Sequence, residues 1–91
     1  MKLKIEEIRE IGENKWLVSG KILLEELQHL IGFEVDDEYK SVKTLNGFLL
    51  ALFKEVPEIG QSIQYKEFKF TIKKKKKRKI LLVEIEKIIN D

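Results

Sequence analysis

A run of carboxylates is the first feature of the sequence that could do chemistry. Glu34, Asp36, Asp37 and Glu38 fall within five residues. Carboxylate oxygens are the ligands that Mg²⁺ and Ca²⁺ prefer, so Asp36, Asp37 and Glu38 are candidate ligands of a weak cation site. Their spacing lacks the alternating ligands and central glycine of an EF-hand loop. The alternative is a solvated acidic loop.

A second feature is a run of seven consecutive basic residues, namely Lys73, Lys74, Lys75, Lys76, Lys77, Arg78 and Lys79. The chain has 18 Lys and Arg against 16 Asp and Glu, so without the run eleven basic residues remain and the rest carries a charge of −5. Nucleic-acid surfaces usually place aromatic or hydrogen-bonding residues among their cations, and this run has none. We therefore expect no specific nucleic-acid partner. The run is interpreted as a solvated hairpin tip that discourages edge-to-edge pairing, and contact with anionic lipid is the alternative.

Other chemical signatures are missing from the sequence. There is no cysteine and a single histidine, His29, so no Ser-His-Asp or Cys-His set can form. His29 is expected to be an exposed helix residue. Neither the Walker spacing nor a glycine-rich strand-to-helix loop occurs. The aromatic residues Trp16, Tyr65, Phe68 and Phe70 resemble a base-stacking platform, but a chain of 91 residues needs such rings in its core.

The first half of the chain predicts a hairpin and two helices. Strands are expected at Lys4–Ile11 and Lys15–Ser19, around a turn at Gly12–Asn14. Apolar residues at helical spacing (Leu23, Leu24, Leu27, Leu30 and Ile31) then predict a short helix that Gly32 ends. After a polar connection, a second helix should carry the widest apolar stripe (Leu45, Phe48, Leu49, Leu52, Phe53 and Val56), with Thr44 as its cap and Pro57 at its end.

The second half predicts three strands. Apolar residues alternate from Ser62 to Tyr65 and from Phe68 to Ile72, and the slip at Lys66 and Glu67 indicates a tight turn or bulge. A last strand follows the basic run. The order β-β-α-α-β-β-β describes an α+β fold, with two helices on a mainly antiparallel sheet, in one domain over residues 1–91. No apolar run approaches the ~20 residues that span a bilayer, so the chain by itself is expected to be soluble.

Six short motifs, in this order and spacing, resemble the transporter-associated domain of the CorC/HlyC family, whose members are called magnesium and cobalt efflux or haemolysin-like proteins. The motifs are WLVSG (Trp16–Gly20), LEEL (Leu24–Leu27), LIG (Leu30–Gly32), TLNG (Thr44–Gly47), PEIG (Pro57–Gly60) and FKFTI (Phe68–Ile72). The resemblance covers the chain from about Ile5 to Ile85. The sequence departs from the family at Leu23, where a small polar cap is more usual, and in its longer basic run.

The resemblance implies a fold similar to a subdomain of the vanillyl-alcohol-oxidase type of FAD-binding domain. It implies that the chain is the C-terminal domain of a longer membrane protein, after a membrane-spanning domain and CBS domains, on the cytoplasmic face of a bacterial membrane. The positions that match the family pattern are structural: Gly20 would let a strand turn into a helix, Thr44 would cap a helix, Gly47 would permit helix–sheet packing, and Pro57 and Gly60 would separate helix and strand.

Two functions from different classes follow from the resemblance. The first is a non-enzymatic regulatory domain of a divalent-cation transport protein, which docks on the CBS and membrane domains of its parent or on a twin copy. The second is a sensor of an adenine nucleotide, a flavin such as FAD, or a divalent cation. The flavin idea rests on fold analogy alone, and one fold hosts unrelated functions.

Overall fold

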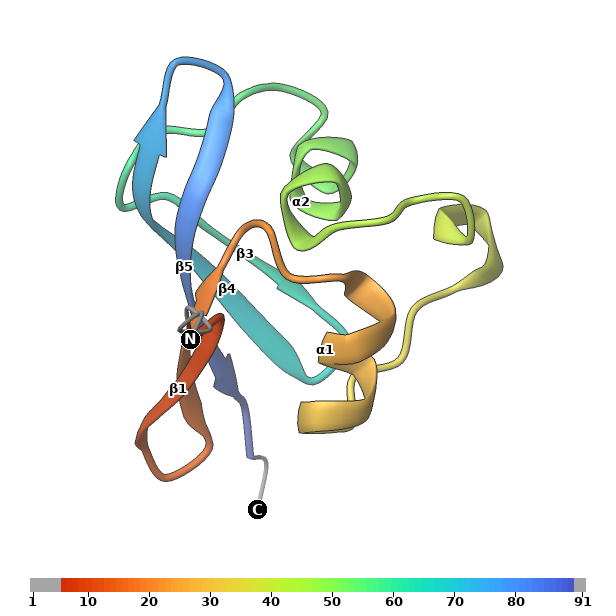
Figure 1. Ribbon diagram of the computed structural model, residues 1–91, viewed down its shortest axis with the longest axis vertical. Helices are drawn as coiled ribbons and strands as arrows, with labels where there is room; N and C mark the ends of the chain where they lie inside the picture. The colour runs from red at the N-terminus through yellow and green to blue at the C-terminus, as the bar shows by residue number, and fades with distance from the viewer. Residues whose placement is uncertain (1–5, 90–91) are drawn as a thin grey trace, which may run out of the picture.

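The computed structural model describes residues 6–89, which form a five-stranded antiparallel sheet with two short α-helices on one face (Figure 1). The elements, in chain order, are β1 (Ile8–Gly12), β2 (Lys15–Ser19), α1 (Leu24–Ile31), the 3₁₀ helix η1 (Asp37–Tyr39), α2 (Leu45–Phe53), β3 (Ser62–Tyr65), β4 (Phe68–Lys76) and β5 (Lys79–Lys87). The strands lie in the order β1-β2-β5-β4-β3, so the last strand in sequence is the middle of the sheet. The predicted α+β fold and element order are confirmed. Of the first predicted strand, Lys4 and Ile5 lie outside the described residues.

The core lies between the helices and the sheet, and Phe33 is at its centre. Its ring lies 5.5 Å from the ring centroids of Phe48, Phe68 and Phe70, with edge-on geometry in each case. Edge-to-face packing of this kind adds to the stabilisation from burial alone. Phe33 therefore joins α2 to strand β4, although it belongs to no helix or strand.

Helix α1 begins without a side-chain cap. Leu23 occupies the N-cap position and makes no cap hydrogen bond, while Gly32 ends the helix in the left-handed conformation at φ 70°. The N–H of Leu24 instead donates to the carbonyl of Lys43 at 2.8 Å. Leu23 and Leu30, predicted as part of the apolar stripe, are 56% and 55% exposed, because a two-layer fold leaves the flanks of a short helix uncovered.

Helix α2 is shorter than the sequence predicts. Thr44 Oγ1 accepts a hydrogen bond from the N–H of Gly47 at 3.1 Å, as expected for a cap. The helix ends at Phe53 rather than next to Pro57, because Lys54 takes a left-handed conformation and donates to the carbonyl of Leu50. Pro57 lies buried in the following connection.

Two of the predicted glycine roles need correction. A Cβ atom on Gly20 would collide with the carbonyl oxygen of Ile80, so Gly20 is required for close approach to β5 rather than for a turn. The nearest atoms to a Cβ on Gly47 belong to Val42, at 3.3 Å, and Thr44, in the segment before α2 rather than in the sheet. Gly60 has φ 92°, which favours glycine at the entry to β3.

Candidate functional site

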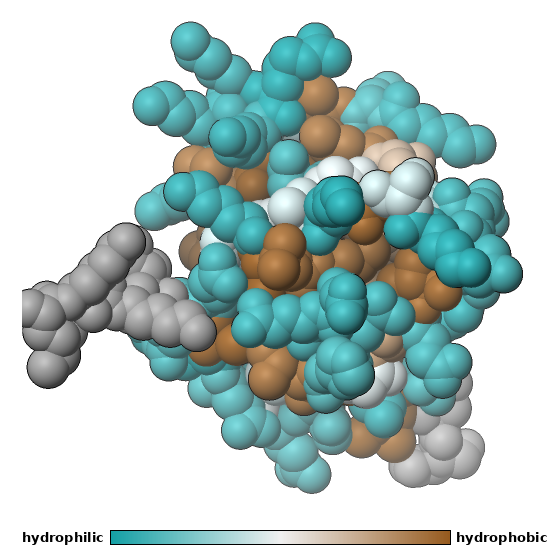
Figure 2. All heavy atoms as spheres, turned by 45° about the vertical axis from the view of Figure 1, so that its right-hand side comes forward, coloured by the Kyte–Doolittle hydropathy of each residue, from teal (hydrophilic) through white to brown (hydrophobic). Residues whose placement is uncertain are grey.

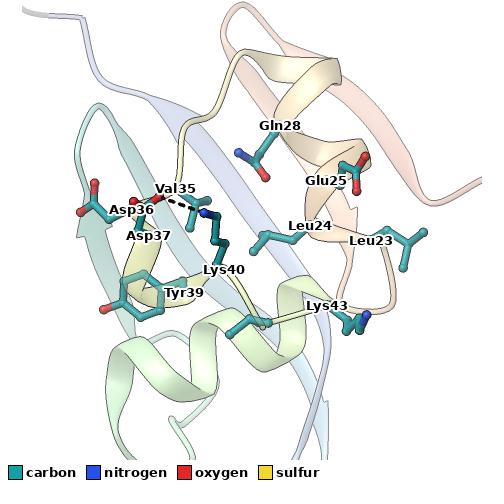
Figure 3. A pocket seen from close by; sticks show the side chains of 11 residues that line it. Leu23, Leu24, Glu25, Gln28, Val35, Asp36, Asp37, Tyr39, Lys40 and Lys43 are labelled. Carbon is teal, nitrogen blue, oxygen red and sulfur yellow. Dashed lines mark ion pairs between the residues drawn. The ribbon is translucent and has the colours of Figure 1, made fainter.

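A groove runs between α1 and the segment that carries η1, and it encloses about 530 Å³ (Figure 3). Its apolar lining comes from both sides: Leu23, Leu24, Val35, Tyr39 and Val42. Charges of both signs surround this lining: Glu25, Asp36, Asp37, Lys40 and Lys43. Lys40 lies between the two walls and pairs with Asp37 at 4.0 Å. The sequence predicted only a polar connection here, and the half-buried Val35, Tyr39 and Val42 correct that prediction.

The far wall of the groove is fixed by contacts with the β3–β4 turn. The carboxylate of Asp36 lies 2.8 Å from the ammonium of Lys66, and the N–H of Asp36 donates to the Tyr65 hydroxyl at 3.0 Å. The hydrogen bond from Lys66, followed by that from the Tyr65 hydroxyl, lowers the pKa of Asp36 below its ordinary value. The same pairing raises the pKa of Lys66, and burial raises the pKa of Tyr65. This segment therefore contacts the β3–β4 turn through one ion pair and one hydrogen bond.

The carboxylates that the sequence offered as cation ligands do not converge. Asp36 pairs with Lys66 and Asp37 with Lys40, while Glu38 lies exposed on η1. Within residues 6–89, no three His, Cys, Asp or Glu side chains are placed to hold one metal ion. Because a hard cation needs several oxygen ligands at one point, this segment does not fit such a site.

The basic run lies mostly in strands rather than in a loop. Strand β4 continues to Lys76 and β5 resumes at Lys79, so only Lys77 and Arg78 form the turn. Six of the seven basic residues are exposed, as expected for a hairpin tip. Figure 2 shows long hydrophilic side chains standing out from the end of the molecule where this hairpin lies in Figure 1.

Lys75 is the exception within the run. Its side chain is only 19% exposed, and its ammonium donates to the carbonyl of Pro57 at 3.0 Å and to Glu58 Oε2 at 3.2 Å. These contacts tie the α2–β3 connection to the hairpin. Nothing in a uniform run of lysines could single out this residue, because its role depends on which face of the twisted strand meets Pro57.

The remaining candidate residues behave as the sequence indicates. His29 is exposed on α1. Tyr65, Phe68 and Phe70 are buried in the core, and Trp16 lies half-buried with its ring 6.4 Å from that of Phe68. The four rings therefore form no open stacking surface. Over the described span from Glu6 to Ile89, no helix has both the length and the apolar character needed to cross a membrane.

Two relatives of known name match most of this chain. The UPF0053 protein YhdP of Bacillus subtilis is 29% identical over 85 residues, which are 93% of this chain and 18% of that protein. The polyamine export protein of Haemophilus influenzae is 27% identical over 60 residues, which are 66% of this chain and 14% of that protein. The chain therefore spans less than a fifth of the length of either relative.

Solved structures share the fold over nearly the whole chain. The transporter associated domain CorC_HlyC of Nitrosomonas europaea is 25% identical with a TM-score of 0.83, covering 92% of this chain and 99% of that one. The corresponding domain from a CBS domain protein of Porphyromonas gingivalis is 24% identical, with a TM-score of 0.80 and coverage of 92% and 100%. A third, from a Xylella fastidiosa hemolysin in complex with Mg²⁺ and Mn²⁺, is 18% identical, with a TM-score of 0.78 and coverage of 92% and 100%.

These matches cover 99% to 100% of the solved chains, so the fold is shared over their whole length. The family model described as the transporter associated domain, CorC_HlyC, matches residues 9–88. This match includes every helix and, apart from Ile8, every strand residue of the fold. The chain therefore belongs to the CorC_HlyC family of transporter associated domains.

Proposed function

We propose that this domain is a non-enzymatic regulatory and interaction module of a longer membrane protein that transports cations. Residues 1–91 form one domain, which acts on the cytoplasmic face of the bacterial membrane by docking on the CBS and membrane domains of its parent. The groove between α1 and η1 is the observation that carries this proposal. Its occupant is a segment of the parent outside this chain, since the chain corresponds to only 14% and 18% of the two relatives.

The composition of the groove supports docking of a protein segment. Interfaces combine an apolar centre, often with an aromatic residue, with a polar rim. Here Leu24, Val35 and Tyr39 supply the apolar centre, and acidic and basic side chains surround it. Leu23 lies at the edge of the groove and remains 56% exposed, so it is available to a partner.

The cargo of the parent is proposed from two relatives. One is a polyamine export protein, and another structure is that of a hemolysin domain in complex with Mg²⁺ and Mn²⁺. Polyamines and divalent metal ions are both small cations. A parent that exports magnesium, cobalt or another small cation fits both relatives.

Substituting Leu23 by Asp tests the docking role without unfolding the domain. Leu23 occupies the N-cap position in an extended conformation, where Asp is among the favoured residues. The change therefore places a charge at the groove while supporting α1. Leu30→Asp is the matched control, because Leu30 is equally exposed on the same helix but does not line the groove.

Two measurements on the full-length protein and its parts complete the test. Binding of the separate 91-residue domain to the remainder of the parent should weaken by about 10-fold in Leu23→Asp, because docking at the groove edge would take the new carboxylate out of water without a partner, which costs at least ~1 kcal/mol. Cation export by cells carrying the variant parent should change in parallel. Equal binding by the Leu23→Asp and Leu30→Asp domains would rule out the groove as the docking site.

A further inference from the structure

The exposed cations of the β4–β5 hairpin make no ion pair with any residue between Glu6 and Ile89. Of the seven basic residues only Lys75 makes an ion pair in the described part of the chain. The other six are exposed along the hairpin, between Lys73 in β4 and Lys79 at the start of β5. Four of them, Lys76, Lys77, Arg78 and Lys79, line a shallow hollow of about 480 Å³ together with Asn46 and the half-buried Leu81.

The residues at the end of the hairpin are locally destabilising. Lys76 and Lys79 face each other directly across the two strands, and like charges in that position are destabilising. Lys77 has φ 56°, a conformation that favours glycine or asparagine. A tip that only needed to be soluble would be satisfied by a Gly or Asn turn. A negatively charged partner would relieve the repulsion and would explain why lysines occupy these positions.

The base of the hairpin is held in a fixed position. Lys75 ties β4 to the α2–β3 connection through Pro57 and Glu58, and the N–H of Ile80 donates to Asn46 Oδ1 at 2.8 Å. The residues next to the tip are therefore held by hydrogen bonds to the rest of the domain. The rest of the chain carries a charge of −5, so an anionic surface attracts the tip and repels the body.

From these observations we infer that the β4–β5 tip binds the surface of an anionic phospholipid membrane through Lys73, Lys74, Lys76, Lys77, Arg78 and Lys79. The exposed side chains of the tip contain no aromatic ring on which a base could stack, whereas juxtamembrane clusters of Lys and Arg suit anionic lipid. The choice of membrane over nucleic acid rests on the proposed function, in which the parent is a membrane protein.

Flotation of the 91-residue chain with phosphatidylcholine vesicles, with and without phosphatidylglycerol, tests the inference. Binding is expected only with phosphatidylglycerol and should weaken as salt is added. A triple variant, Lys77→Gly with Arg78→Ser and Lys79→Ser, should bind on the order of 100-fold more weakly, since each charge near the surface contributes roughly five-fold. Circular dichroism should show that it retains the native fold.

The matched control removes three exposed lysines elsewhere, in Lys21→Ser with Lys40→Ser and Lys43→Ser. It has the same net charge as the triple variant and should keep most of the vesicle affinity. Equal losses in both variants would mean that net charge alone is responsible, and the inference would be wrong. It would also be wrong if DNA of matched charge displaced the wild-type chain from the vesicles at physiological salt.

Leu23→Asp separates this inference from the proposed function. Helix α1, which forms one wall of the groove, and the β4–β5 turn lie in different parts of the fold (Figure 1). The Leu23→Asp domain should therefore float with phosphatidylglycerol vesicles like the wild type even where its docking is lost. If the hairpin triple variant loses flotation but still docks on the parent, then the tip contacts the membrane and the groove does not.

Discussion

The tight turns before and after β4 each begin with a lysine in a left-handed conformation. The two lysines differ in what their side chains contact. Lys66, in the β3–β4 turn, has φ 54°, and Lys77, in the β4–β5 turn, has φ 56°. The ammonium of Lys66 lies 2.8 Å from Asp36 and 5.5 Å from the centroid of the Tyr65 ring. Lys77 has no ion pair among the described residues, and its neighbours are other cations.

This difference indicates two uses for one backbone conformation. At Lys66 the unfavourable φ is offset by an ion pair and by a cation–π contact that fix the wall of the groove. At Lys77 no ion pair with the described residues, 6–89, offsets the unfavourable φ. Strain without internal compensation is typical of sites that meet something outside the fold, which is why the second turn carries the membrane proposal.

The largest expected loss of stability comes from removing a core ring next to the β3–β4 turn. Phe33 packs edge-on against Tyr65, which precedes Lys66, as well as against Phe68. Phe33→Ala should destabilise the domain by about 3–5 kcal/mol, because a buried ring leaves a cavity. Urea denaturation followed by Trp16 fluorescence would measure it, with exposed His29→Ala as a control that should change little. A loss below ~1 kcal/mol would show that Phe33 is not the centre of the core.

Removing the Tyr65 hydroxyl, which also lies at the β3–β4 turn, should reduce the stability of the domain by a smaller amount. Tyr65→Phe leaves the N–H of Asp36 without its 3.0 Å acceptor, and a typical hydrogen bond contributes about 1 kcal/mol. Tyr39→Phe is the matched control, because its half-buried ring contacts Tyr65 but its hydroxyl makes no hydrogen bond among residues 6–89. Equal denaturation midpoints for the two variants would contradict the assigned role of the hydroxyl.

Glycine substitutions compare the two turns directly. Lys77→Gly should stabilise the domain by roughly 0.5–1 kcal/mol, because it removes the strain of a positive φ and one of the crowded charges. Lys66→Gly should stabilise less or destabilise, since the same gain is offset by loss of the contacts with Asp36 and Tyr65. Thermal unfolding of both variants would measure the difference. The comparison fails if Lys66→Gly proves the more stable of the two.

Acid should weaken the ion pair between Asp36 and Lys66, which lies in the β3–β4 turn. The pKa of Asp36 in the folded domain is lowered below 3.8 by its hydrogen bond with Lys66, so its contribution to stability is present above pH 3.8. That contribution is lost as the pH falls through the lowered pKa. Below pH 3.8, Asp36→Asn should therefore lose less stability relative to neutral pH than the wild type does. Parallel pH profiles of urea unfolding for the two proteins would argue against the ion pair.

The sequence predicted the elements well because their signals are local. Strand β2 runs from Lys15 to Ser19 as expected, and the Thr44 cap and the Gly32 helix end are where the pattern places them. The central position of Phe33 could not be predicted, because it lies outside any periodic segment and its neighbours come from distant strands. For the same reason the sequence could not predict the ion pair of Asp36 with Lys66 or that of Lys75 with Glu58. Local patterns therefore predict elements, whereas the groove and its ion pairs depend on tertiary packing.

The central position of β5 determines when the domain can form during synthesis. Residues Lys79–Lys87 separate the β1–β2 hairpin from the β3–β4 hairpin, and β5 pairs with both β2 and β4. A ribosome makes the two flanking hairpins first and the strand that joins them last. The sheet is therefore incomplete until these residues have left the exit tunnel. In a parent protein, every segment upstream of this domain is synthesised before the fold can close.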